Sequence, residues 1–190
     1  MPMDNAATWT LLSAGYVTEG VASTVVLIVE GDVVAVVDPG MVADRARIID
    51  PLAAAGYAAT DVTDVVLSHH HPDHTMNIAL FLSARVHDFQ AIYRHDQWTR
   101  RPADGVLLSP SVRFLHVPGH TPQDLATVVA TPDGVAVCTH AWWSEAGPAD
   151  DPYAPDRDQL RSARERVLAL ADVVIPGHGI PFVPTADTVR

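Results

Sequence analysis

A short histidine-rich stretch contains residue types that bind metal ions. His69, His71, Asp73 and His74 lie within six residues, in the order His-x-His-x-Asp-His. Neutral imidazole and carboxylate are the usual protein ligands for zinc and for several neighbouring transition metals. A chance histidine tract on the surface is the alternative, but this stretch is internal and includes a carboxylate. We therefore predict a metal site here.

The elements on either side of this stretch would position its side chains. Residues 62–67 are an apolar run that predicts a buried strand, and residues 76–82 are expected to form a helix. The rigid strand would fix the backbone, and the loop would let the side chains converge. His70 lies between expected ligands and should point away from the metal.

Three more histidines each follow an expected strand. They are His120 after residues 112–117, His140 after residues 135–139, and His178 after residues 172–175. Ligands that are remote in sequence meet when their strands share one edge of a sheet. This shared position is the main argument for a single site.

The remaining elements follow from turn residues and apolar spacing. Two hairpins are expected, one from residues 25–30 and 33–37 and one from residues 125–131 and 135–139. Apolar residues at helical spacing predict helices at residues 45–55 and 157–170. A short strand is expected at residues 85–89, and irregular polar segments at residues 93–105 and 150–155.

Length and composition indicate one domain over residues 1–190. A hydrophobic content of 48% with 18% charged residues is typical of a globular enzyme. No apolar run approaches the roughly 20 residues that cross a bilayer, and residues 1–5 lack the basic and apolar parts of a secretory signal. The single cysteine, Cys138, excludes an internal disulfide and fits a reducing compartment. We expect a cytoplasmic protein without a membrane partner.

A net charge of −11 argues against a general nucleic-acid binder. Nucleic acid remains possible as a substrate, because bound metal ions add local positive charge that the formal count omits. The expected partner is a small-molecule or short anionic substrate, and an oligomer is conceivable.

Four motifs together resemble the metallo-β-lactamase superfamily and cover nearly the whole chain. They are the hairpin ending in Asp38-Pro39-Gly40, the stretch 69–74, Pro118-Gly119-His120-Thr121, and Pro176-Gly177-His178-Gly179. Residues 171–182 are similar to the small stand-alone metallo-β-lactamase domain-containing hydrolases, some of which act on RNA phosphodiesters. The resemblance implies an α/β fold, a four-layer αββα sandwich with metals in a cleft at one sheet edge.

The resemblance also implies a role for each candidate residue. It implies His69, His71 and His120 at a first metal, Asp73, His74 and His178 at a second, and Asp38 as a carboxylate that orients a ligand from beneath. The implied cofactor is zinc, one or two ions per chain, with iron or manganese as alternatives.

One position departs from the family pattern. The family carries an Asp that bridges the two metals, and here the matching pair is Thr139-His140. His140 could bind one ion, swing away, or leave the bridge to water. A weaker second metal and a more cationic site would follow, which favours an anionic substrate. Glu145, Asp150 or Asp151 could restore a carboxylate from the following loop.

These features predict a metal-dependent hydrolase that uses activated water to cleave a phosphodiester, ester, thioester or lactone. Asp73 is the expected proton acceptor, and His140 is the candidate general acid if it is not a ligand. A mononuclear non-haem iron oxidoreductase of the persulfide dioxygenase type is one alternative, which the missing bridging carboxylate disfavours. A metal-binding scaffold with little activity is the other.

Several aromatic and basic residues have less specific interpretations. Of Trp142 and Trp143, one ring could wall the substrate cleft, although a core position is equally expected. The segment with Tyr93, Arg94, Trp98, Arg100 and Arg101 could clamp an anion, but a solvated surface is the simpler interpretation. Cys138 is expected to be a packed core thiol, and His87, His95 and His116 to be structural or exposed.

Overall fold

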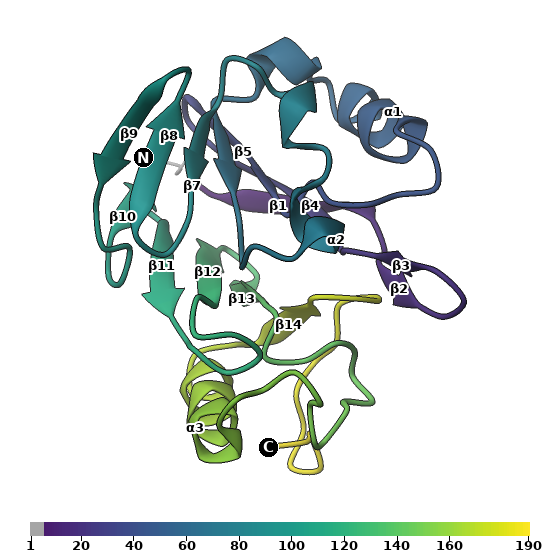
Figure 1. The fold of residues 1–190 in the computed structure, drawn as a ribbon. Coiled ribbons are helices and arrows are strands. Elements are labelled where there is room, and N and C mark those ends of the chain that lie inside the picture. Colours follow the sequence, from purple (N-terminus) through teal and green to yellow (C-terminus); the bar gives the residue numbers. More distant parts are fainter. Residues whose placement is uncertain (1–5) are drawn as a thin grey trace.

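Two β-sheets stack face to face, with one long helix outside each sheet, in a computed structural model that describes residues 6–190 (Figure 1). The seven-stranded first sheet has the order β1 (Thr8–Ser13), β4 (Val25–Glu30), β5 (Val33–Val37), β6 (Asp64–Val66), β7 (Arg85–His87), β8 (Ala91–Arg94), β9 (Gln97–Arg100). The five-stranded second sheet has the order β10 (Leu107–Ser109), β11 (Val112–His116), β12 (Leu125–Thr131), β13 (Gly134–Thr139), β14 (Val173–Pro176). A small ribbon pairs β2 (Tyr16–Val17) with β3 (Val21–Ala22). The helices are α1 (Ala46–Ala54), α2 (Pro72–Thr75) and α3 (Arg157–Leu168), with 3₁₀ turns η1 (Ala59–Asp61) and η2 (Ile78–Leu80).

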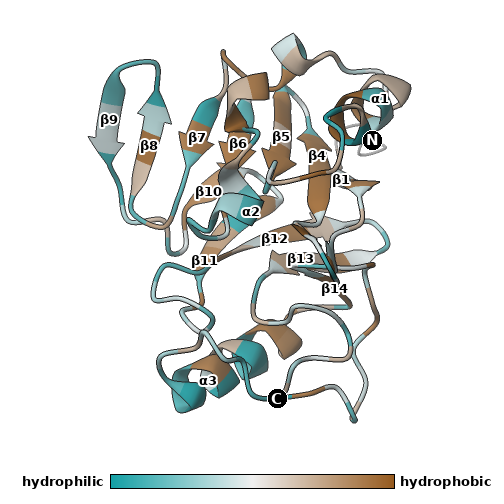
Figure 2. Ribbon diagram, turned by 45° about the vertical axis from the view of Figure 1, so that its right-hand side comes forward, coloured by the Kyte–Doolittle hydropathy of each residue, from teal (hydrophilic) through white to brown (hydrophobic). Residues whose placement is uncertain are grey.

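The apolar side chains fill three layers, as the expected αββα sandwich requires. Neighbouring residues on a strand point to opposite faces. Ile28 of β4 therefore lies between the two sheets, while Leu27 packs in the layer under α1 together with Leu52 of that helix. Leu160 of α3 packs in the third layer, beneath the second sheet. Figure 2 shows α3 with an apolar side and a polar side, so its amphipathic pattern matches its place on the outside of the sandwich.

Strand direction brings the metal-binding loops to one edge of the sandwich. In the first sheet β5, β6 and β7 run parallel. In the second sheet β13 and β14 are parallel, and β11 has the same direction because β12 is antiparallel to both of its neighbours. Carboxyl ends of parallel strands open onto one edge, where ligand sites form. The loops after β5, β6, β11, β13 and β14 consequently face one another.

The helix expected at residues 76–82 was predicted in the wrong place. Helix α2 begins earlier, at Pro72, and ends at Thr75, and only the 3₁₀ turn η2 follows. Proline suits the first position of a helix, so it starts α2 inside the histidine stretch. Asn77 then binds the preceding loop, because its backbone N–H donates to the carbonyl of Pro39 (2.8 Å) and its side chain to that of Gly40 (2.6 Å).

The irregular segment expected at residues 93–105 was also wrong in part, because β8 and β9 form a hairpin at the edge of the first sheet. Every residue of β9 is exposed, so no alternation of apolar and polar residues signals a strand. Tyr93 pairs with Trp98 across the hairpin. Strand β1 was not anticipated either. The two predicted hairpins and the helices near residues 45–55 and 157–170 are confirmed.

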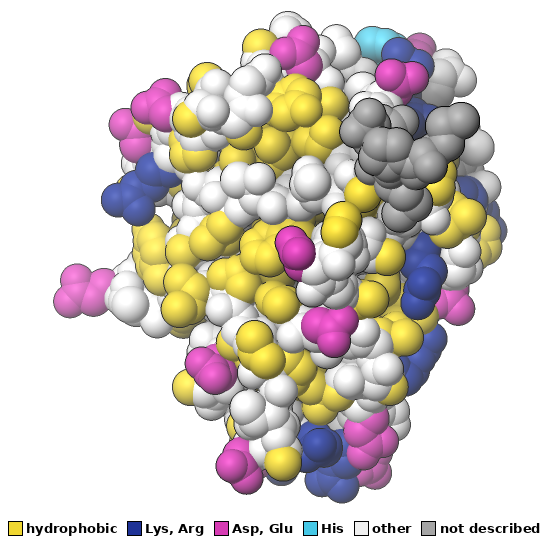
Figure 3. Space-filling model, turned by 180° about the vertical axis from the view of Figure 1, so that it is seen from behind, with side chains coloured by type: hydrophobic (Ala, Val, Ile, Leu, Met, Phe, Trp, Pro, Cys, Tyr) yellow, Lys and Arg dark blue, Asp and Glu magenta, His cyan; other side chains and the backbone are white. Residues whose placement is uncertain are grey.

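The outer surface carries no broad cationic face in the view opposite to Figure 1. Figure 3 shows arginine side chains at both edges and at the lower tip, separated by apolar and acidic side chains. The chain contains no lysine, and its net charge is −11. Among the described residues, no helix is both long and apolar enough to cross a membrane.

Asp64 is a buried carboxylate that joins β6 to β7. Its Oδ1 accepts hydrogen bonds from Nε2 of His87 (2.7 Å) and Nε of Arg85 (2.8 Å), and its Oδ2 accepts one from Arg85 Nη2 (3.0 Å). Burial alone would raise the pKa of Asp64, but these hydrogen bonds hold it below the usual 3.8. The stabilisation from a depressed pKa is fully present above about pH 4 and is lost as the pH falls through the lowered value.

Replacing Asp64 with asparagine should therefore lower the free energy of unfolding by about 2 kcal/mol near neutral pH, a value reduced because Arg85 is half-exposed. Urea denaturation at pH 7, 5 and 3.5 measures this difference from the wild type. The difference should shrink at the lowest pH, where the carboxylate of the unfolded wild-type chain begins to protonate. An exposed turn residue, Asp133, offers the control Asp133→Asn. If the difference in unfolding free energy between variant and wild type stays constant from pH 7 to pH 3.5, the ionised Asp64 carboxylate is not the source of the stabilisation.

Candidate metal centre

The histidine stretch and three remote histidines meet at the edge formed by the strand ends. The first sheet supplies His69, His71, Asp73 and His74 from the loop after β6 and from α2, and the second sheet supplies His120, His140 and His178 from the loops after β11, β13 and β14. Every ligand candidate from the sequence thus lies in one cluster. Each sheet holds only part of it.

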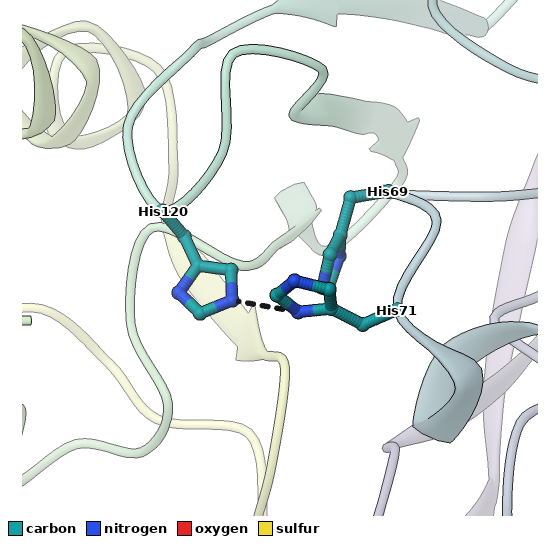
Figure 4. Close-up of side chains that lie close together, drawn as sticks. All are labelled: His69, His71 and His120. Carbon is teal, nitrogen blue, oxygen red and sulfur yellow. Dashed lines mark hydrogen bonds between the residues drawn. The ribbon is translucent and has the colours of Figure 1, made fainter. Parts of the chain in front are cut away.

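Three imidazoles form the first ligand group (Figure 4). Ligand atoms of His69, His71 and His120 lie within 4.8 Å of one another. Nδ1 of His71 is 3.1 Å from Nε2 of His120. Figure 4 shows His120 reaching across from the opposite side to the two histidines of the β6 loop. This arrangement provides three nitrogen ligands from two separate parts of the chain.

A carboxylate and two imidazoles form the second group. Asp73, His74 and His178 also have ligand atoms within 4.8 Å of one another. Oδ2 of Asp73 is 3.5 Å from Nε2 of His74 and 3.6 Å from Nε2 of His178. Zinc with ligands at about 2.0–2.1 Å in tetrahedral geometry separates neighbouring ligand atoms by roughly 3.3 Å. The observed spacings are close to this value.

Acceptor groups outside the cluster fix the tautomers of three histidines. The pairs are Nδ1 of His74 with Oδ2 of Asp38 (2.9 Å), Nδ1 of His120 with Oδ2 of Asp151 (2.7 Å), and Nδ1 of His178 with the carbonyl of Ala22 (2.8 Å). An ionised carboxylate and a carbonyl can only accept, so each Nδ1 carries the proton. The lone pair of each Nε2 then points into the cluster, as metal binding requires.

The buried imidazoles are held in the neutral form that binds metals. Burial, together with the neighbouring imidazoles, keeps the pKa of His69 well below its usual value, and burial also lowers the pKa of His178. Nε2 of His69 and Nε2 of His74 are buried and have no hydrogen-bond partner among residues 6–190. Buried polar atoms normally have one, since leaving them unpaired is costly. The donor set therefore fits metal ions, and imidazole with carboxylate suits zinc and iron.

Asp38 lies beneath His74, at the end of β5. Its Oδ1 accepts the backbone N–H of Ser68 (2.7 Å) while Oδ2 binds His74, so one carboxylate links two strand ends and a ligand. A side chain at Gly40 would meet the carbonyl of Asp73. The Asp-x-Gly turn therefore lets the backbone of the β5 loop approach α2 closely enough to support it.

Asp151 is a part of the site whose role the sequence did not reveal. Its carboxylate lies within 4.8 Å of ligand atoms of His120 and His140, and its Oδ2 accepts hydrogen bonds from Nδ1 of His120 (2.7 Å) and Nε1 of Trp143 (2.8 Å). Glu145 and Asp150 are exposed. Although burial acts to raise the pKa of Asp151, the bond to His120 and one from the backbone of Tyr153 keep it below its usual value. No sequence pattern pairs His120 with a residue in an irregular loop.

Arg164 of α3 anchors the loop that carries Asp151 and Trp143. The side chain is 1% exposed. Its nitrogens donate to the carbonyls of Ala141 (2.8 Å), Pro148 (2.8 Å) and Ala149 (3.0 Å). Its guanidinium also lies 5.6 Å from the ring centre of Trp142. A buried cation whose donors are satisfied by one loop fixes the course of that loop.

Replacing Asp151 with asparagine should weaken metal binding by about 10- to 100-fold, because the amide accepts the His120 proton less strongly than a carboxylate. Competition with a chromophoric chelator measures the affinity. The adjacent Asp150→Asn is the matched control, because Asp150 is exposed and its ion pair within the described part of the chain is with Arg157 at 3.3 Å. Equal affinities for the two variants would show that Asp151 does not support His120.

A cavity of about 360 Å³ opens beside the cluster. Its lining residues are Val17, Val21, His71, Pro72, Asp73, His120, His140, Trp143, Tyr153 and His178. The rings of Trp143 and Tyr153 stack at 5.8 Å. Trp143 is thus the ring that walls the cleft, and Trp142 is a core residue with no exposed surface. Asp73 is the only carboxylate in this lining, and none of the described lining residues is an arginine.

The remaining candidates lie away from the cavity. His70 points outward and binds Asp88 (3.0 Å), and His87 binds Asp64. Cys138 is buried between the sheets, where burial raises the pKa of its thiol. The arginines near residues 93–101 lie on or beside the β8–β9 hairpin, and Arg101 sits 5.4 Å over the ring of Phe114.

Comparisons with known proteins give one consistent family. The sequence model of the metallo-beta-lactamase superfamily matches residues 18–101. The human metallo-beta-lactamase domain-containing protein 1 is 38% identical over 77% of this chain and 58% of its own length. The protein of the same name from Xenopus laevis is 30% identical over 83% of this chain and 71% of its own length. The chain thus spans between 58% and 71% of these two relatives.

Solved structures with the same fold are more distant in sequence. A metallo-beta-lactamase-like protein of Thermotoga maritima superposes with a TM-score of 0.74 at 20% identity, covering 94% of this chain and 100% of its own. The dizinc quorum-quenching lactonase AidC reaches a TM-score of 0.64 at 20% identity, covering 87% of this chain and 77% of its own. Sequence relatives and fold agree, and the chain belongs to the metallo-beta-lactamase superfamily.

Proposed function

We propose that this chain is a metal-dependent hydrolase that cleaves an ester-like bond in a small substrate. The observation that carries the proposal is the cluster of imidazole lone pairs and one carboxylate beside an open cavity. Structural relatives that include lactonases and a dizinc enzyme support a metal-dependent hydrolase at the level of the superfamily. Bound ions would supply a nucleophile from water at neutral pH and polarise the bond that is cleaved. Zinc is our first choice of metal.

The residues His69, His71 and His120 would hold one ion, and Asp73, His74 and His178 a second. Asp38 and Asp151 would orient His74 and His120 through the hydrogen bonds described above. We assign the proton acceptor to Asp73, because it is the only carboxylate in the cavity lining. Burial and four neighbouring imidazoles keep the pKa of His140 well below its usual value, so its ring is a poor proton donor.

The cavity walls support an acyl substrate ahead of a phosphodiester. Val17 and Val21 on one side and Trp143 and Tyr153 on another offer apolar and aromatic contact. Only the metal ions would neutralise an anionic group there, since the described lining contains no arginine. We therefore propose a carboxylic ester, thioester or lactone. An N-acyl homoserine lactone hydrolase shares the fold with a TM-score of 0.66 at 16% identity, which makes an acyl lactone a useful probe.

A second candidate is the mononuclear iron oxidoreductase. Asp73, His74 and His178 form the set of two histidines and one carboxylate that non-haem iron enzymes use. A structural relative, TTHA1623, was solved in a di-iron-bound form, with a TM-score of 0.64 at 20% identity. Metal identity in protein purified without added metal separates the two candidates, because a single iron per chain would favour the oxidoreductase.

Turnover of four probes tests the hydrolase directly. The probes are an aryl acyl ester, an acyl thioester, an acyl lactone and bis(p-nitrophenyl) phosphate, each with zinc-loaded and with chelated protein. We expect zinc-dependent turnover of at least one acyl probe, faster than that of the phosphodiester. His71→Ala should abolish this turnover and His70→Ala should keep it, since these neighbouring histidines point to opposite sides. If zinc-loaded protein turns over none of the probes, the hydrolase proposal fails and the remaining interpretation is a metal-stabilised scaffold.

A further inference from the structure

Among the described residues, His140 lacks the outside acceptor that orients three other histidines of the cluster. His74, His120 and His178 each place Nδ1 on an acceptor, whereas Nδ1 of His140 is buried without a partner among the described residues. Its Nε2 lies 3.2 Å from Nε2 of His178. No hydrogen bond to a described residue outside the cluster therefore fixes the tautomer of His140.

The ring of His140 has no room to turn away. Its side chain is almost fully buried, and its ring centre lies 4.1 Å from that of His120. On another side it contacts the backbone of Gly177, where any side chain would collide with the imidazole. Gly177 is itself held by a hydrogen bond from its N–H to the carbonyl of Trp142 (3.0 Å). Packing from the loops after β11 and β14 thus keeps His140 facing His178.

Two Nε2 atoms this close need a proton or a metal ion between them, because two facing lone pairs repel each other. The lone pair of His178 Nε2 points inward, because its Nδ1 proton is bound to the Ala22 carbonyl. A proton on His140 Nε2 would satisfy this one pair but would leave the buried Nε2 of His74, in the same ligand group, without a partner among the described residues. A metal ion shared by the two atoms also fits, because two nitrogens on tetrahedral zinc are separated by roughly 3.3 Å.

We propose that His140 Nε2 is a fourth ligand of the metal held by Asp73, His74 and His178. Of the six spacings among these four ligands, those of His140–His178, Asp73–His74 and Asp73–His178 are 3.2, 3.5 and 3.6 Å and approach the edge of a zinc tetrahedron. Ligand atoms of His140 and His74 lie within 4.8 Å of each other. The proposal rests on the metal-dependent function above and deepens it. The centre of Asp73, His74, His140 and His178 is then closed by protein, while the centre of His69, His71 and His120 keeps one position open to the cavity.

The two metal positions would consequently have different tasks. Four protein ligands are typical of a structural zinc site, and three ligands with one open position are typical of a catalytic one. His71 and His120 line the cavity, so the open position faces the substrate. The ion at the closed position should exchange slowly with chelators, and the ion at the open position should exchange faster and interact with substrate or inhibitors.

Cobalt(II) titration of metal-free protein tests the proposal without reference to turnover. Wild-type protein should bind two ions, one of which resists a chelator and gives the intense visible absorption of four-coordinate cobalt. In His140→Ala the affinity of this ion should fall by more than the about 10- to 100-fold that loss of an outer hydrogen-bond partner causes. Added imidazole should restore affinity and absorption by filling the vacated space. His70→Ala is the control and should match the wild type.

Retention of two ions with wild-type affinity in His140→Ala would overturn the proposal. If this variant does not fold by circular dichroism, His140→Gln decides, because the amide keeps a hydrogen bond to His178 but is a poor zinc ligand. Loss of the tightly held ion in His140→Gln supports a ligand, and its retention overturns one. An inactive wild type with the predicted two-ion behaviour would refute the hydrolase and leave the ligand assignment standing.

Discussion

Substitution of Asp73 with asparagine is expected to lower kcat/KM for the acyl ester by about 10³-fold. Asp73 combines two tasks, since its Oδ2 lies between His74 and His178 and the residue also lines the cavity. Asparagine keeps the shape of the side chain, but it removes the negative charge and the capacity to take a proton. Initial rates at saturating and limiting substrate, with zinc present throughout, measure the change.

Metal content must be determined for the same samples, because the substitution also weakens a ligand. If elemental analysis finds as much zinc in the variant as in the wild type while the rate falls, loss of the proton acceptor explains the lower rate. The exposed Asp133→Asn carries the same change of charge far from the cavity and should keep wild-type rates. A kcat/KM within tenfold of the wild type for Asp73→Asn would remove Asp73 from the chemistry.

Removal of metal is expected to lower the melting temperature by about 8 to 16 °C. Free zinc at 1,000 times its dissociation constant stabilises a folded protein by about 4 kcal/mol, and each kcal/mol shifts the melting temperature of a chain of this size by about 2–4 °C. The fall in melting temperature should be large for two reasons. The ligands come from both sheets, and without metal the buried Nε2 atoms of His69 and His74 have no partner among the described residues. Differential scanning fluorimetry with and without chelator measures the shift, and added zinc should reverse it.

A variant that lacks two ligands of the first group, His69→Ala/His120→Ala, provides the comparison. Its melting temperature should respond less to the chelator than that of the wild type, because only the second group can still bind an ion. If the wild type melts at the same temperature within about 2 °C with and without chelator, the cluster does not contribute a bound ion to stability.

The ligand cluster was predictable because its residues occupy local patterns at strand ends. His69, His71, Asp73 and His74 are contiguous, and His120 and His178 each follow an apolar run in a Pro-Gly-His context. Strand direction then brings the loops to one edge without any further information. The αββα fold followed from the resemblance carried by the same motifs.

The features that sequence analysis missed depend on contacts between distant or irregular segments. Asp151 lies 31 residues from its partner His120, in a loop whose course depends on the buried Arg164. Strand β9 is exposed on both faces because it forms the edge of its sheet. Helix α2 was displaced because Asn77 binds the loop after β5, which local helical propensity does not register.

The division of the ligands between the two sheets also sets when a growing chain can first retain an ion. Synthesis that has reached the end of β11 provides His69, His71 and Asp73 but not yet His120, and the second group stays incomplete until β14 supplies His178. Strand β14 can pair with β13 only after α3 has crossed over, since those two strands are parallel. Capture of the proposed second ion would therefore be a late step of biogenesis, and a ribosome-bound intermediate stalled before β14 would leave that ion to the cell's metal buffers.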